Sequence, residues 1–233
     1  MTTAAVPGPQ GPVDLEIIAD IACPWCYIAH RRLERVLRAS PEIAAVTTIR
    51  HRAFLLQPEL PPEGVDGPAY FAAKFGGAER VRMMRERVIA AGASESIAFA
   101  FEKQLRASNT RLAHRVVAVV QEAGASATRT VDALFTGHFE EGLDVGDLDA
   151  MLARLEASAA LAGTGLDGAT IQARLADGGG DAAVTDDLQF AGAIGVTGVP
   201  FIIANKRVAF SGAQPEEAFR ELLAIANSDL PAA

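Results

Sequence analysis

The sequence predicts an α/β fold in which two strand-containing segments flank a large, all-helical block. A strand–helix–strand pattern fills residues 13–52, and a strand–strand–helix pattern fills residues 198–226. Between them, residues 69–176 are dominated by Ala, Leu, Arg and Glu, with apolar residues at spacings of three and four. The 233 residues are enough to bury a sizeable core.

The first unit begins with a strand over residues 13–19, where apolar/polar alternation passes into an apolar run. A helix is predicted from Cys23, because apolar residues follow at helical spacing and a first turn tolerates Pro24. It should end before Pro41, since the residue preceding a proline is pushed out of the α region. The β-branched residues of segment 46–52 predict the second strand, which makes the unit βαβ.

The C-terminal segment returns to strands after a helix over residues 183–193. Two short apolar runs, residues 198–203 and 208–210, are separated by a turn that contains Asn205, which predicts a hairpin. A last helix should start with Pro215 in its first position and run to about Ala226.

Loops rich in proline and glycine mark the expected domain boundaries. Residues 57–68 form the first such loop, and about five short helices should follow it. The expected organisation is a flexible tail (residues 1–12), a discontinuous domain (13–62 and 179–228) and an inserted helical domain (63–178).

Charge and hydropathy exclude two classes of partner. The 21 Lys and Arg residues against 29 Asp and Glu residues give a net charge of −8, so no nucleic-acid partner is expected. No stretch approaches the ~18 apolar residues of a membrane span, so no membrane partner is expected. The N-terminal residues lack the charged and apolar regions of a secretory signal, and we expect a cytoplasmic protein.

The two cysteines, Cys23 and Cys26, form a single C-x-x-C motif at the start of the first predicted helix. Unpaired N–H groups and the positive end of the helix dipole favour the thiolate of Cys23 there. Cys26 follows at nearly one helical turn, near enough to attack a mixed disulfide formed at Cys23. A zinc half-site is the alternative, but zinc needs four ligands and the histidines show no clustered spacing, so no metal is expected; they are His30, His51, His114 and His138.

A proline at the start of a late strand is the second element of the predicted site. Pro200 follows Gly198 and Val199. Taken alone, this pattern is typical of a trans proline at the first residue of a strand.

Four ordered motifs resemble the FrnE-like subgroup of the DsbA-type thioredoxin superfamily. They are DIACPWCYI (residues 20–28), SNTRLAHR (108–115), GVTGVPF (195–201) and SGAQP (211–215). The resemblance covers about residues 13–226 and implies a thioredoxin-like fold with a large all-helical insertion. It also implies a redox-active disulfide Cys23–Cys26 with no further cofactor, and a cis Pro200 facing it. The exposed backbone of Val199 would then offer an edge to an extended substrate peptide.

Asp20 and His114 are candidates for moving a proton. Asp20 precedes Cys23 by three residues at a strand end, where it could accept or pass a proton during resolution by Cys26. An ordinary cap of the following helix is an equally open interpretation. His114 follows Thr110 by one helical turn and can point to the same face, although a lone histidine is more often a surface or packing residue.

The remaining candidates are expected to contact substrate: Pro24, Trp25, Val199, Asn109, Thr110 and Phe54. The resemblance places Asn109 and Thr110 opposite the site on the helical block, while the local pattern alone allows a simple helix N-cap. Phe54 lies in an apolar segment at the expected domain junction, where ligand pockets are favoured, although such a stripe is more often core.

The predicted function is a thiol–disulfide oxidoreductase or isomerase acting through mixed disulfides. Its substrates would be disulfide-containing proteins or low-molecular-weight thiols, and it would work as a monomer or a homodimer. The motif lacks the Pro-His pair of strongly oxidising DsbA enzymes, so we expect a reduction potential between roughly −270 and −120 mV. Such a pair would be mainly reduced in a cytosol.

Two alternatives remain open at this stage. Kappa-type glutathione transferases and 2-hydroxychromene-2-carboxylate isomerases carry a serine in place of Cys23 and an Asp-Arg pair where this chain has residues 212–215. Both departures favour dithiol redox chemistry. Because these families have a similar architecture, a thiol-dependent isomerase or transferase is kept as the first alternative. A chaperone in which the cysteines are incidental is the second.

Overall fold

A four-stranded sheet forms the centre of the computed structural model, which describes residues 11–228. The strand order is β2-β1-β5-β6, with β1 and β2 parallel and β5 and β6 each antiparallel to its neighbours. The strands are β1 (Val13–Ala19), β2 (Thr47–Ala53), β5 (Phe201–Ala204) and β6 (Val208–Ser211). Residues 1–10 of the predicted tail lie outside the described residues.

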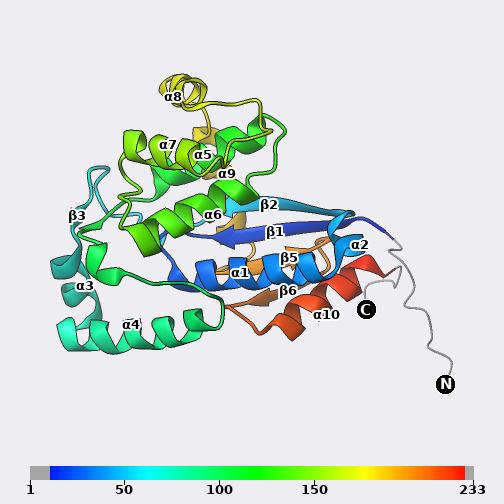
Figure 1. The fold of residues 1–233 in the computed structure, drawn as a ribbon, viewed down its shortest axis with the longest axis horizontal. Coiled ribbons are helices and arrows are strands. Elements are labelled where there is room, and N and C mark those ends of the chain that lie inside the picture. Colours follow the sequence, from blue (N-terminus) through cyan, green and yellow to red (C-terminus); the bar gives the residue numbers. More distant parts are fainter. Residues whose placement is uncertain (1–10, 229–233) are drawn as a thin grey trace.

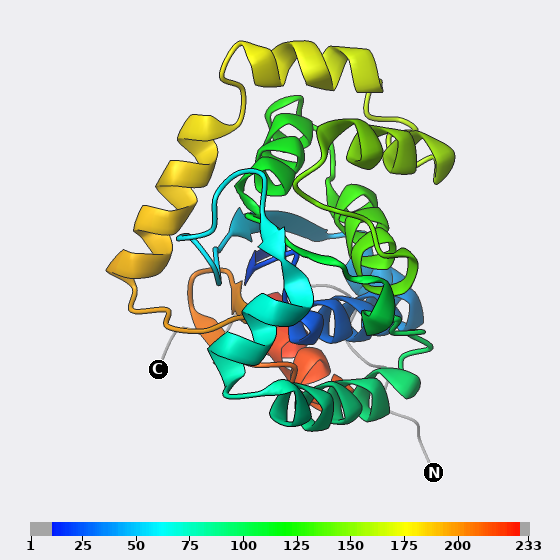
Figure 2. The same cartoon turned by 90° about the vertical axis from the view of Figure 1, so that its left-hand side faces the viewer.

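Helices cover both faces of this sheet (Figures 1 and 2). α1 (Pro24–Ala39) and α10 (Glu216–Asn227) pack together on one face, and α9 (Asp181–Ala193) lies on the other. Every residue of β1 except Asp14 is consequently buried, which explains the apolar run of this strand. The order of elements in both flanking units agrees with the order predicted from the sequence.

Local signals set the ends of these elements. α1 starts at Pro24 and ends at Ala39, two residues before Pro41. In the β5–β6 turn Asn205 and Lys206 have positive φ angles of 49° and 55°, in the left-handed region that Asn tolerates better than most residues. Pro215 is the N-cap of α10 and not its first helical residue, a shift of one position from the prediction.

The segment between β2 and α9 is the predicted helical insertion. It contains, within the described residues, α3 (Gly67–Phe75), α4 (Ala78–Ala93), α5 (Arg111–Glu122), α6 (Thr128–Thr136), α7 (Leu148–Ala157) and α8 (Gly168–Ala176). A 3₁₀-helix, η1 (Phe101–Lys103), and a π-helix, η2 (Gly137–Glu141), complete it. None of the helices within residues 11–228 is long and apolar enough to span a membrane.

A short antiparallel ribbon joins the helices of the insertion and was not predicted. β3 (Val65–Asp66) pairs with β4 (Arg106–Ala107). Two-residue strands are too short to show the alternation from which strands are predicted. The ribbon ties the proline- and glycine-rich loop after β2 to the segment that leads into α5.

The sheet and the insertion share one hydrophobic core. Tyr27 on α1 is fully buried, and its ring stacks on Phe135 of α6 and Phe139 of η2 at centroid distances of 5.2 and 5.9 Å. The edge of Phe99 meets the same ring at 6.0 Å. These contacts fix the insertion against the helix that carries the cysteines.

We expect Phe219→Ala to lower the free energy of unfolding by about 3–5 kcal/mol. Phe219 lies on α10, is fully buried and meets Phe210 edge-on at 4.9 Å. Urea unfolding followed by circular dichroism measures the change. Ile225→Ala on the same helix is the matched control, because Ile225 is 41% exposed, and it should cost less than about 1 kcal/mol. Equal losses in the two variants would contradict this description of the core.

Candidate active site

Cys23 lies in the turn after β1, at the N-terminus of α1. It is the N-cap residue with extended backbone, and its carbonyl oxygen accepts hydrogen bonds from the backbone N–H groups of Cys26 (3.0 Å) and Tyr27 (3.3 Å). Both cysteines are free thiols and buried, with 5% of Cys23 and 2% of Cys26 exposed. The two sulfur atoms therefore belong to the first turn of a helix, where the sequence places them.

Cys26 lies in an environment that keeps its thiol protonated. Burial raises the pKa of Cys26 well above its usual value, and the neighbouring Cys23 and the charge of Asp20 act in the same direction. The thiolate is the reactive form of cysteine, so Cys26 is a poor first nucleophile at neutral pH. Cys23, in contrast, lines the pocket described below.

The loop before β5 approaches Cys23 from the opposite side. The Cys23 thiol lies 3.7 Å from the carbonyl oxygen of Val199, and the Val199–Pro200 peptide bond is cis. Pro200 is buried, and its carbonyl oxygen accepts a hydrogen bond from the N–H of Gly212 at 2.8 Å. Val199 is half-buried and lines the pocket beside the thiol.

The carboxylate of Asp20 is buried directly behind this turn. One oxygen accepts a hydrogen bond from the Leu56 N–H at 2.6 Å, and the other accepts one from the Ala22 N–H at 3.1 Å and lies 3.6 Å from Nε2 of His114. Burial by itself would raise the pKa of Asp20, but His114 and the two N–H donors outweigh it and hold the pKa below its usual value.

The alternative interpretation of Asp20 as a cap of α1 is wrong. The N-cap position is taken by Cys23, and no side chain caps this helix. The carboxylate of Asp20 instead lies 3.6 Å from Nε2 of His114 on α5, a buried residue of the insertion. The structure thus brings together the two residues that the sequence singled out for moving a proton.

A pocket of ≈ 460 Å³ opens beside Cys23, at the end of the sheet toward which β1 and β2 run and where α3 and α4 lie (Figure 1). Pro24, Trp25 and Val199 line it on the side of Cys23. The insertion supplies mostly apolar lining residues, among them Phe71, Phe75, Met84, Val88, Phe101 and Phe139. Its size lies within the usual range of small-molecule sites, and the lining includes two cations, Arg85 and Arg87.

Asn109 and Thr110 do not line this pocket, and their predicted contact with substrate stays a prediction. The Asn109 amide donates to the carbonyl oxygen of Leu60 at 2.7 Å and accepts from the N–H of Arg111 at 3.0 Å. It faces a separate pocket of ≈ 260 Å³. Thr110 is the buried N-cap residue of α5 by its backbone position, and its side chain makes no capping hydrogen bond.

Phe54 is also displaced from the pocket by its packing. Its side chain joins the small apolar cluster around Ile18 and Ile203, next to Val199. The neighbouring Leu56 and Gln57 reach the pocket instead. The predicted contact of Phe54 with substrate stays a prediction.

The pocket wall on the insertion was missed by the sequence analysis. Phe71 and Phe75 are spaced one helical turn apart on α3, which is a detectable signal for a shared face. Phe101 and Phe139 come from η1 and η2, which no local pattern brings together. Arg85 on α4 lies with its guanidinium 5.1 Å from the Phe101 ring centroid, a cation–π contact that positions it at the pocket.

Comparison with known families gives a match over most of the chain. The model of the DSBA-like thioredoxin domain matches residues 14–224. A comparison with curated proteins gives no match.

Several solved structures are similar to this chain. A probable DsbA oxidoreductase from Streptomyces coelicolor is 29% identical, with a TM-score of 0.80, over 95% of this chain and 92% of that chain. The cytosolic disulfide reductase DsbM from Pseudomonas aeruginosa, solved with GSH, is 15% identical over 89% and 97%, with a TM-score of 0.61. A 2-hydroxychromene-2-carboxylate isomerase is 17% identical over 91% and 94%, also with a TM-score of 0.61. The last two likenesses show the shared fold alone.

We expect alkylation to distinguish the two thiols. In Cys26→Ser the remaining Cys23 should react with iodoacetamide near neutral pH. In Cys23→Ser the remaining Cys26 should react slowly there and gain rate only above about pH 9, because burial still raises its pKa above the usual value of 9.0. Mass spectrometry of samples quenched across a pH series measures both rates. Fast alkylation of Cys26 at neutral pH in the folded variant would contradict this description of its environment.

Proposed function

The chain belongs to the DsbA-like thioredoxin family, and on that basis we propose that it is a thiol–disulfide oxidoreductase whose reactive couple is Cys23 and Cys26. The observation that carries the proposal is the asymmetry of the two thiols. Cys23 lines the pocket, whereas Cys26 is buried behind it with a raised pKa.

The proposed reaction proceeds through a mixed disulfide. The Cys23 thiolate attacks one sulfur of a substrate disulfide, forms a bond to it and releases the other sulfur as a thiolate. Cys26 then loses its proton and attacks the Cys23 sulfur, which forms the Cys23–Cys26 disulfide and releases the second substrate thiolate. Two electrons pass from the protein to the substrate, and the reverse sequence oxidises a dithiol.

Asp20 and His114 are the proposed route for the proton of Cys26. The charge of Asp20 acts on Cys26, and its carboxylate lies 3.6 Å from the His114 imidazole. Imidazole is the side chain suited to holding a proton near neutral pH. The pair would accept the proton as the Cys26 sulfur attacks, and return it when the couple is reduced.

The substrate is expected to contact Pro24, Trp25 and Val199 at the mouth of the pocket. Trp25 is 40% exposed there, and the backbone edge of Val199 can pair with an extended peptide. Protein disulfides and low-molecular-weight disulfides both fit this arrangement. We further propose a cytoplasmic protein, monomeric or homodimeric, that needs no cofactor beyond its own cysteine pair.

A thiol-dependent isomerase or transferase is the second candidate. The observation that favours it is the apolar pocket of ≈ 460 Å³ beside Cys23, which can enclose a small molecule. In that reaction Cys23, or a thiol bound near it, would add to an electrophile and later be eliminated. Such chemistry does not use Cys26, and this difference separates the two candidates.

We expect Cys26→Ser to trap the mixed disulfide. With oxidised glutathione as the probe, this variant should gain one glutathionyl group at Cys23 and lose repeated turnover, because nothing resolves the adduct. Intact-mass spectrometry measures the adduct, and a coupled glutathione assay measures turnover. Cys23→Ser is the control and should remain unmodified near neutral pH. Undiminished disulfide turnover in Cys26→Ser would contradict the dithiol mechanism. If the protein catalyses only the addition of a thiol to an electrophile, the isomerase or transferase function would be favoured.

We expect Asp20→Asn and His114→Gln to slow resolution by about 10²-fold, with the first attack by Cys23 much less affected. Removal of the Asp20 charge by itself would lower the pKa of Cys26 and speed resolution, so a slower step cannot come from the loss of that charge beside Cys26. The defect should shrink as the pH rises, because hydroxide can then take the proton. Stopped-flow decay of the mixed disulfide measures the step.

Asp187→Asn is the matched control for this experiment. Asp187 is also buried and ion-paired, with Arg52 at 2.7 Å and the Ala53 N–H at 3.0 Å, and it lies outside the pocket. It should destabilise the fold without changing the rate of resolution. If Asp187→Asn and Asp20→Asn slow resolution equally, the effect comes from destabilisation of the fold. That result would refute the proposed proton transfer through Asp20 and His114.

A further inference from the structure

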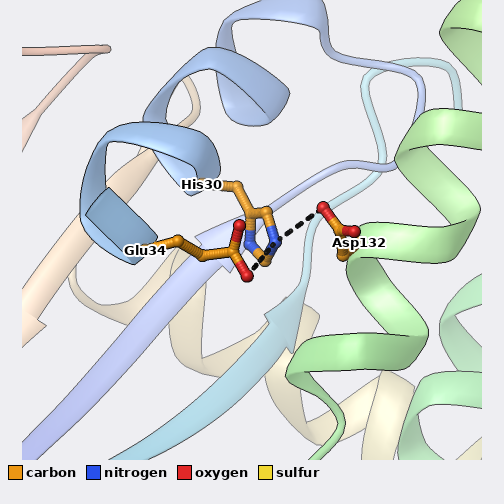
Figure 3. Close-up of side chains that lie close together, drawn as sticks. All are labelled: His30, Glu34 and Asp132. Atoms are coloured by element: carbon orange, nitrogen blue, oxygen red, sulfur yellow. Dashed lines mark ion pairs between the residues drawn. The ribbon is translucent and has the colours of Figure 1, made fainter. Parts of the chain in front are cut away.

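A histidine and two carboxylates converge where the insertion packs on α1 (Figure 3). His30 and Glu34 are one helical turn apart on α1, and Asp132 comes from α6. His30 Nε2 lies 3.4 Å from Asp132 Oδ1 and 3.9 Å from Glu34 Oε1. Each residue offers one potential ligand atom, and these three atoms lie within 4.8 Å of one another. The group does not contribute to the thiol pocket.

The imidazole of His30 is the second sign of a ligand at this position. Its side chain is 5% exposed, and its Nε2 atom points at the two carboxylates (Figure 3) without a hydrogen bond of good geometry, although Asp132 Oδ1 lies 3.4 Å away. Buried polar atoms without a partner are rare and need an explanation, such as a missing ion. The neighbouring His51 does not supply a partner, because its ring centroid is 6.3 Å away.

We propose that His30, Glu34 and Asp132 bind one zinc ion. Zinc takes imidazole nitrogen and carboxylate oxygen at about 2.0–2.2 Å, so ligand atoms of a tetrahedral site lie roughly 3.3–3.6 Å apart. The His30–Asp132 distance already has this value, and a small rotation of Glu34 brings its oxygen in. Three protein ligands leave the fourth position to water.

The guanidinium of Arg31 already forms ion pairs with both carboxylates to which the zinc ion would bind. Its Nη1 atom lies 2.9 Å from Asp132 Oδ1 and 3.3 Å from Glu34 Oε2, and its Nη2 atom donates to the Tyr27 hydroxyl at 2.8 Å. Arg38, on the same face, reaches Glu34 at 3.7 Å. Zinc binding would displace the Arg31 contacts to the carboxylates, while the bond to Tyr27 keeps the guanidinium nearby. Arg31 thus acts as a competitor that sets the affinity.

The proposed site would act as a clamp between the two parts of the fold. It joins α1, which carries the cysteines at its N-terminus, to α6 of the insertion. Zinc bound only to the folded protein would stabilise this junction by linkage. The inference does not depend on the redox function, since neither cysteine belongs to the site.

Zinc titration of a Cys23→Ser/Cys26→Ser protein tests the proposal without competition from the thiols. We expect one equivalent to bind, measured against a chromophoric chelator. Cobalt, used as a spectroscopic substitute, should give d–d bands. Loss of even an outer-shell partner costs roughly 10–100-fold in metal affinity, so His30→Gln and Asp132→Asn should each weaken binding by at least that much. Asp149→Asn, an exposed carboxylate on α7, is the matched control and should bind as before.

Two further measurements complete the test. Arg31→Gln should bind zinc several-fold more tightly, because the competing cation is gone. Zinc should also raise the Tm of the cysteine-free protein and leave the Tm of its Asp132→Asn variant unchanged, which gives an answer even if His30→Gln fails to fold. Absence of saturable binding, unchanged affinity in Asp132→Asn or in Arg31→Gln, or a Tm shift that survives Asp132→Asn would overturn the proposal and leave the cluster as an ion pair only.

Discussion

The buried carboxylate of Asp20 is the interaction on which the arrangement of the site depends. It binds the active-site turn through Ala22, the loop after β2 through Leu56, and the insertion through His114. A buried charge is tolerated only when it is paired and hydrogen-bonded, so these three segments cannot separate without a large cost. Because the pKa of Asp20 is lowered, its ionisation adds stability that is fully present above the usual value near 3.8 and is lost as the pH falls through the lower folded value.

α1 is the second shared element, since it belongs to the sheet layer and to the core of the insertion. Tyr27 is stacked between helices of the insertion, and its hydroxyl donates to Glu140 at 2.6 Å and lies 3.0 Å from Thr136 Oγ1. Burial and the bond to Glu140 raise the pKa of Tyr27 to about 12, so the hydroxyl remains a donor at any ordinary pH. The pocket wall formed by the insertion is consequently held at a fixed distance from the thiols. The two parts that the sequence analysis treats as separate domains, the thioredoxin-like domain and the helical insertion, share one continuous hydrophobic core.

The sequence predicts what is decided locally. The strand from Val13, the helix from Cys23 and the hairpin at Asn205 follow from periodicity, proline placement and turn chemistry. The sequence alone does not decide the role of Asn109, because a helix-capping motif and a substrate-facing motif have the same local pattern; in the structure its side chain accepts a hydrogen bond from the Arg111 N–H. The pocket wall at Phe139 depends on contacts between distant segments, for which one sequence holds no periodic signal.

The reactive cysteines and most of the pocket wall come from different parts of the fold. The turn between β1 and α1 carries the cysteines, and the insertion supplies most of the apolar lining residues. The β1–α1 turn supplies the chemistry, with one sulfur at the pocket and one sulfur kept protonated behind it. A mixed disulfide places the substrate sulfur against Cys23, so the group attached to that sulfur must enter the pocket or lie along the Val199 edge. The apolar walls disfavour hydrated groups close to the sulfur, and Arg85 and Arg87 can accept a carboxylate farther out. In the proposed reaction, residues of the insertion contribute to substrate choice together with Pro24, Trp25 and Val199, and they can change without altering the thiol pair.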